Sequence, residues 1–97
     1  MAGSVKIWLD DLRTASEGYI HCYSVFEAKI RIEEFERAST IIQVIDCDHD
    51  LGSNSKDGDG IQLLDWLVER GTLYPIKLHT MNPVGRANMQ RMIERYW

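Results

Sequence analysis

The chain has little of what membrane-spanning and secreted proteins rely on. It contains two cysteines and two prolines in 97 residues, and no apolar run approaches the roughly 18 residues that a membrane span needs. The first residues, MAGSVKIWLDD, lack the basic start and the apolar stretch of a signal peptide. Cys22 and Cys47 have no CxxC spacing. We therefore expect a cytoplasmic protein without contact to a membrane, in which both thiols are buried and reduced.

The chain is also short of positive charge. It has 11 lysines and arginines against 15 aspartates and glutamates, which gives a net charge of −4. Such a charge disfavours bulk duplex nucleic acid, because the DNA or RNA backbone is itself anionic. A small basic patch at a pocket is still compatible with it. With 44% hydrophobic residues, the chain can bury a core, and we expect residues 1–97 to form a single domain.

Short apolar runs alternate with longer amphipathic segments. The short runs predict strands at residues 5–9, 19–23, 40–48 and 75–81. Strands that alternate with helices predict an α/β fold with a parallel sheet and right-handed crossovers. The run at 40–48 is apolar at both alternating sets of positions, so we expect a central strand covered by helices on both sides. The polar, Gly-rich residues 52–59 predict a flexible loop.

Three helices are predicted from their end signals. Ser24 and Glu27 form a capping box at the start of the first helix. The second helix is expected over 60–71, with a glycine as its last, left-handed residue. The third begins with Asn82 as N-cap and Pro83 in its first turn.

Acidic side chains follow the first and third predicted strands. Because the carboxyl ends of neighbouring parallel strands meet at one edge of a sheet, these acids would crowd together. Two like charges about 4 Å apart repel by about 4 kcal/mol at an effective dielectric constant of about 20. Such a group takes up protons or binds a cation, and short acids favour Mg²⁺ (or Mn²⁺). The alternative is that single acids cap helices or turns. The acids at these positions are Asp10, Asp11, Asp46, Asp48 and Asp50, of which we predict Asp10, Asp11, Asp48 and Asp50 as metal ligands.

Two histidines stand at the ends of the third and fourth predicted strands. His49 and His79 carry imidazoles, the side chain that titrates near neutral pH. Around one phosphodiester, such a pair can act as general base and general acid. The alternative is that each ring is hydrogen-bonded in place without a catalytic role.

The start of the third predicted helix is suited to bind an anion. Thr80 and Asn82 precede the helix, and Gly85 lies in its first turn, where free N–H groups can approach a phosphate. Because Gly85 lowers helix propensity, it calls for the close approach of a ligand or of a packed backbone. Arg13 and Arg86 could clamp phosphate oxygens, or could pair with the acids instead.

Three motifs resemble those of a known family. WLDDLR at 8–13, DHDLG at 48–52 and HTMNPVG at 79–85 are similar to the motifs of the cyclic-phosphate processing receiver domain family. The resemblance implies a flavodoxin/receiver-like α/β fold with a parallel sheet of about four strands. Compared with an ordinary receiver domain, a loop stands in place of the first helix and the fifth strand is missing. Phosphotransfer from a histidine kinase is therefore not expected.

The resemblance also implies site residues and a function. Asp10 and Asp11 would hold Mg²⁺, Asp48 would match the phosphoacceptor, and Thr80 would contact the phosphoryl group. We expect binding and metal-assisted hydrolysis of a cyclic phosphate, with Asp48, His49 and His79 as catalytic residues. The ligand would be a 2′,3′-cyclic phosphate at an RNA end or a cyclic nucleotide. The alternative is a non-catalytic sensor or protein-interaction module, and the open sheet edge would allow a homodimer.

Overall fold

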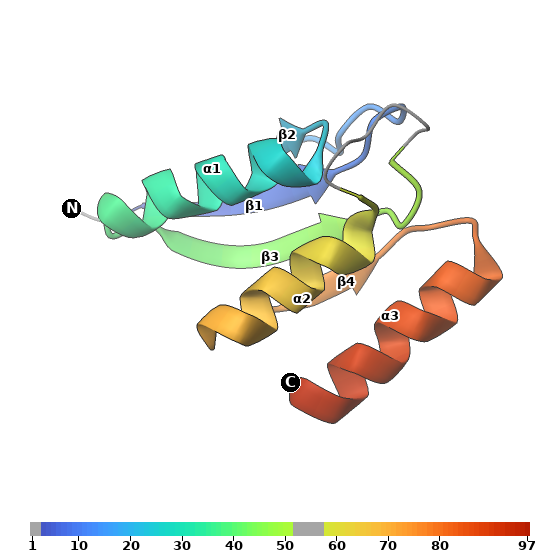
Figure 1. Cartoon of the computed structure of the whole chain (residues 1–97). Coiled ribbons are helices and arrows are strands. Elements are labelled where there is room, and N and C mark those ends of the chain that lie inside the picture. The colour runs from blue at the N-terminus through green and yellow to red at the C-terminus, as the bar shows by residue number, and fades with distance from the viewer. Residues whose placement is uncertain (1–2, 52–57) are drawn as a thin grey trace.

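The computed structural model describes residues 3–51 and 58–97, in which four strands form one parallel sheet (Figure 1). The strands lie in the order β2-β1-β3-β4. They are β1 (Ser4–Leu9), β2 (Tyr19–Cys22), β3 (Ile41–Cys47) and β4 (Ile76–Leu78), and the helices are α1 (Val25–Arg37), α2 (Gly60–Arg70) and α3 (Pro83–Tyr96). The predicted α/β fold, with four parallel strands and no helix between the first two, is confirmed. Residues 52–57, most of the predicted loop, lie outside the described residues.

The helices begin and end where local chemistry predicts. The Ser24 hydroxyl accepts a hydrogen bond from the N–H of Glu27 at 3.1 Å, and Asn82 Oδ1 accepts one from the N–H of Gly85 at 3.0 Å. Both bonds satisfy N–H groups that a first helical turn leaves unpaired. Gly71 ends α2 in the left-handed conformation, with φ of 73°. Of the helices in the described residues, none has the length and apolar character that crossing a membrane requires.

The hydrophobic core lies between one face of the sheet and the helices. Figure 1 shows α1 and α2 side by side over this face, with α3 beside α2. The sheet contributes buried Ile7, Leu9 and Ile45, and α1 contributes an apolar stripe that includes Val25 and Ile32. Both cysteines are buried in this core and free, as predicted. The core thus depends on one face of the sheet.

The prediction that helices cover both faces of β3 is wrong. No helix in the described ranges lies on the opposite face (Figure 1), and Val44, which points there, is only half-buried. The ladder between β1 and β3 shifts register between Val5 and Lys6. This irregularity turns Ile42 and Ile45 to the same side although they are three residues apart. The apolar run therefore serves one buried face.

Three strands end level with one another, and this positions the candidate site. Leu9 pairs with Cys47, and Cys47 pairs with Leu78. The ladder continues by one bond on each side, because the N–H of Asp48 donates to Leu9 O at 2.9 Å and the N–H of His79 donates to Cys47 O at 3.0 Å. The residues that follow β1, β3 and β4 therefore start from the same edge of the sheet.

Candidate metal and phosphate site

Three carboxylates meet at this edge. Asp10 and Asp11 follow β1, Asp48 follows β3, and one oxygen from each lies within 4.8 Å of the others. The sequence predicted these three as metal ligands, and the structure brings them together. Three short carboxylates are a donor set that hard divalent cations such as Mg²⁺ or Mn²⁺ prefer.

Asp10 is held as an ionised acid despite its burial. It is 1% exposed, and burial by itself acts to raise the pKa of the carboxyl. The N–H groups of Arg13 and Leu12 donate to Asp10 Oδ1 at 2.9 and 2.8 Å. Together with His79, they outweigh burial and lower the pKa of Asp10. Asp10 is therefore a fixed negative charge in the site.

Asp48 is in the opposite situation. Burial raises its pKa, and the charge of Asp10 adds to this effect. Hydrogen bonds from the Thr80 hydroxyl and from the N–H of His49 act against the rise without cancelling it. The group of acids is therefore short of positive charge, which a bound cation would supply. The donors and their electrostatics both fit a divalent metal.

His79 joins the acid group through Asp10. Its Nε2 lies 2.9 Å from Asp10 Oδ2, and its Nδ1 lies 2.7 Å from Asp46 Oδ1. The ring stacks on Trp8 with centroids 4.0 Å apart and planes 9° apart. Asp46 is a site residue to which sequence reasoning gave no role. Its two-residue spacing from Asp48 on a strand, which turns both side chains to the same face, was the available signal.

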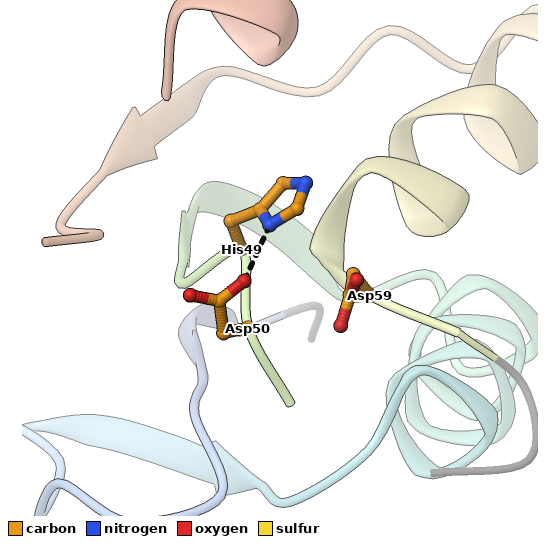
Figure 2. Close-up of side chains that lie close together, drawn as sticks. All are labelled: His49, Asp50 and Asp59. Carbon is orange, nitrogen blue, oxygen red and sulfur yellow. Dashed lines mark hydrogen bonds and ion pairs between the residues drawn. The ribbon is translucent and has the colours of Figure 1, made fainter. Parts of the chain in front are cut away.

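A second group of possible ligands surrounds His49 (Figure 2). His49 Nδ1 lies 2.8 Å from Asp50 Oδ1, and Asp59 at the start of α2 completes a group whose ligand atoms lie within 4.8 Å of one another. His49 and then Asn82 lower the pKa of Asp50. We expected Asp50 in one cluster with the other acids. The structure instead places it in this separate group, because the chain turns away from the sheet edge after Asp48.

The start of α3 holds the His49 group in place. The amide of Asn82 donates to both carboxylate oxygens of Asp50, at 3.2 and 3.3 Å. A Cβ atom at Gly85 would lie 2.4 Å from His49 Cγ. The two reasons considered for Gly85 were a ligand and a packed backbone, and the structure shows a third, the packed side chain of His49. We expected free N–H groups in the first turn of this helix, but those of Val84 and Gly85 both donate to Asn82 Oδ1.

The side chains of the two predicted arginines reach the end of β4, Arg13 from the loop after β1 and Arg86 from α3. Arg13 Nη1 donates to His79 O at 3.0 Å, and Arg86 Nη1 donates to Leu78 O at 3.4 Å. Both residues are exposed. In the part of the chain that the structure describes, neither forms an ion pair with the acids, which was the alternative considered. They supply positive charge beside the strand ends.

The chain matches one family model. The model is described as the cyclic-phosphate processing receiver domain, and it matches residues 5–95. No curated protein and no solved structure matches the chain. The matched range contains every residue of the two groups described above.

Proposed function

The chain belongs to the cyclic-phosphate processing receiver domain family, and from this premise we propose that its strand-end site binds a cyclic phosphate beside a divalent cation and hydrolyses it. The substrate is a 2′,3′-cyclic phosphate at an RNA end or a cyclic nucleotide. The main support is the convergence of Asp10, Asp11 and Asp48 within 4.8 Å, from segments far apart in the sequence.

Asp10, Asp11 and Asp48 would hold Mg²⁺ or Mn²⁺. A cation held by these residues would supply Lewis-acid chemistry, polarising a phosphoryl oxygen and offsetting charge on the phosphate. The raised pKa of Asp48 supports this role, because burial and the neighbouring charge of Asp10 penalise its ionisation until positive charge is present.

The phosphate would be held by side chains at the end of β4. Arg13 and Arg86 each use one guanidinium nitrogen on a backbone carbonyl, so their remaining N–H groups can donate to phosphate oxygens. Thr80 and Asn82 would add a hydroxyl and an amide. Gly85 contributes by leaving room for the His49 ring.

Hydrolysis needs two proton transfers. Water adds to phosphorus, one P–O bond of the cyclic ester breaks, and the departing oxygen takes up a proton. His49 and His79 would serve as general base and general acid in these transfers. Asp48 would lie beside the phosphate as a cation ligand that also accepts a hydrogen bond from the Thr80 hydroxyl.

Phosphorus NMR tests this proposal directly. With Mg²⁺ and a nucleoside 2′,3′-cyclic phosphate, we expect the cyclic signal to give way to that of a phosphomonoester. His79→Ala should abolish turnover and keep Mg²⁺ binding. His21→Ala is the matched control, because this ring stacks on Tyr23 and bonds the Asp10 backbone carbonyl at 2.7 Å but belongs to neither group of possible ligands in the described residues. Full turnover in His79→Ala would remove the histidine mechanism, and a wild-type protein that neither binds nor converts any cyclic phosphate would overturn the function.

One observation favours a non-catalytic sensor as the second candidate. Both ring nitrogens of His79 face carboxylates, Asp46 and Asp10, and this arrangement holds the ring rather than leaving it to exchange protons with a substrate. A sensor would bind the cyclic phosphate and gain thermal stability by mass action, without forming product. Thermal unfolding with the ligand, followed by analysis of the phosphorus spectrum, separates the two candidates.

A further inference from the structure

The face of the sheet opposite the core has its own set of side chains. Successive residues of a strand point to opposite faces. Because Ile7 and Leu9 are buried under the helices, Lys6 and Trp8 point the other way. The register of the ladders identifies their neighbours on the other strands. We call this surface the open face; it presents Lys6, Trp8, Tyr19, His21, Val44, Asp46 and Lys77.

The open face carries positive charge on a protein whose net charge is −4. Lys6 and Lys77 are both exposed. The acid that the described strands turn to this side, Asp46, is buried and bonded to His79. Lys6 Nζ lies 5.6 Å from the ring centre of Tyr19. The strands thus combine two exposed ammonium groups with a half-buried aromatic ring, and Asp46 does not compete for a bound anion.

The open face leads directly to the acid group. Trp8 stacks on His79, and the His79 ring in turn bonds the carboxylate of Asp10. With a strand rise of about 3.3 Å per residue, Lys77 lies about 7 Å along the chain from His79, and Lys6 about 13 Å from Asp10. A phosphate held at the strand ends is therefore beyond the reach of Lys6. Lys6 is therefore placed to bind a second anionic group of the same ligand, farther from the strand ends.

We propose that the open face binds the single-stranded RNA that leads to a 2′,3′-cyclic phosphate end, with Lys6 and Lys77 on its backbone phosphates. This inference rests on the proposed function of the strand-end site, and it selects an RNA end over a free cyclic nucleotide. A cationic surface with an aromatic ring is how proteins hold single strands without reading their sequence. Two copies of the chain that met through their open faces would bring like-charged lysines together, whereas an RNA backbone is anionic, so charge complementarity favours RNA.

The test compares three probes by equilibrium binding at two salt concentrations with Mg²⁺. They are a nucleoside 2′,3′-cyclic phosphate, a short oligoribonucleotide that ends in the cyclic phosphate, and the same oligomer ending in a 3′-hydroxyl. The variant is Lys6→Glu with Lys77→Glu. The matched control is Arg37→Glu with Arg91→Glu, which makes the same change in net charge at exposed residues of α1 and α3.

We expect the wild type to bind the cyclic-ended oligomer at least about tenfold more tightly than the nucleotide. The lysine variant should lose this gain, and the arginine control should keep it. Loss of two phosphate contacts should also reduce the slope of log K against log salt by about 1.4. If the glutamate variant does not fold, Lys6→Gln with Lys77→Gln should show the same loss to a smaller extent.

Equal wild-type affinity for nucleotide and cyclic-ended oligomer overturns the inference, as does an unchanged oligomer affinity in the lysine variant. A third outcome is that both oligomers bind equally well and need the lysines, while the nucleotide does not bind. This result would support RNA binding by the open face and contradict the proposed function. A change of oligomeric state in the lysine variant, measured by sedimentation, would make the open face a contact between copies and would also overturn the inference.

Discussion

The pKa values of two aspartates in the same site are shifted in opposite directions by their immediate neighbours. Asp10 receives backbone hydrogen bonds from Leu12 and Arg13, which lower its pKa despite burial. Asp48 receives fewer compensating bonds and lies next to the charge of Asp10, so its pKa is raised. At the scale of single residues, the protein thus stabilises one negative charge and leaves the next one uncompensated.

Asp48→Asn should therefore stabilise the protein without metal at pH 7. Because the pKa of Asp48 is raised on folding, the folded state favours its protonated form, and stability is lost as the pH rises through that pKa. The gain should vanish below the pKa of an unfolded aspartate, about 3.9. Thermal unfolding in a chelator at several pH values measures it, with exposed Asp65→Asn as control. The same variant should lose its stabilisation by Mg²⁺. A lower melting temperature than the wild type at pH 7 would contradict this account.

Gly85→Ala should destabilise the protein. In a solvent-exposed helix this change usually adds about 0.5–1 kcal/mol of stability. Here the new Cβ would lie 2.4 Å from His49 Cγ, and overpacking of this kind costs about 1–3 kcal/mol. Urea unfolding measures the difference, and affinity for a cyclic phosphate should fall with it. Gly3→Ala is the control, because no atom lies within 4 Å of its added Cβ. An unchanged or higher stability of Gly85→Ala would mean that the ring does not pack there.

At the scale of elements, the first turn of α3 connects fold and site. Asn82 accepts the N–H groups of Val84 and Gly85 through its side-chain oxygen and donates to Asp50 through its amide nitrogen. One side chain thus starts a helix and holds the acid that bonds His49. A change in the helix start should therefore be felt in the ligand site.

Asn82→Ala should lower the free energy of unfolding by about 0.5–2 kcal/mol through loss of the cap. It should also weaken binding of a cyclic phosphate, because Asp50 loses a partner. Ser24→Ala removes the equivalent cap of α1 and should cost similar stability with no effect on binding. Urea unfolding and calorimetric titration of both variants check this. Equal ligand affinity in the two variants would show that the start of α3 does not influence the ligand site, contrary to this prediction.

The parts of the fold that depend on residues close together in the sequence could be predicted from it. The caps at Ser24 and Asn82 and the end at Gly71 are local, so the starts of the helices and the end of α2 could be predicted. The burial of only one face of β3 was not predicted, because the register shift beside Val5 is a property of two paired strands together. The apolar pattern of β3 alone does not contain it.

The same distinction applies to the candidate site. Asp10, Asp11 and Asp48 could be predicted as one group, because parallel strands end at a common edge. The association of Asp50 with Asp59 could not, because it depends on the path of the chain between them, which follows no strand or helix period. For Asp46, alternation along β3 gave the direction of the side chain but not its partner, His79.

At the scale of the whole molecule, a single core under one face of the sheet shields both thiols. Burial raises the pKa of Cys22 to about 12 and raises the pKa of Cys47 as well. Since the thiolate is the reactive form, both should react with a thiol reagent far more slowly in the native protein than in denaturant. Absorbance after addition of a disulfide reagent measures the rates. Reaction of both thiols at the denatured rate without denaturant would contradict the buried core.

The central claim is that two segments far apart in the sequence, one with Asp10 and Asp11 and the other with Asp48, hold one cation at the edge of the sheet. Titration with Mn²⁺, followed by the amide signals in ¹H–¹⁵N NMR spectra, tests it most directly, because the paramagnetic ion broadens signals near its site. We predict that signals around Asp10, Asp48 and Thr80 disappear together at the lowest Mn²⁺ concentrations, and that Asp48→Asn prevents this. Broadening confined to one of these segments, or equal broadening in the Asp48→Asn variant, would contradict the claim.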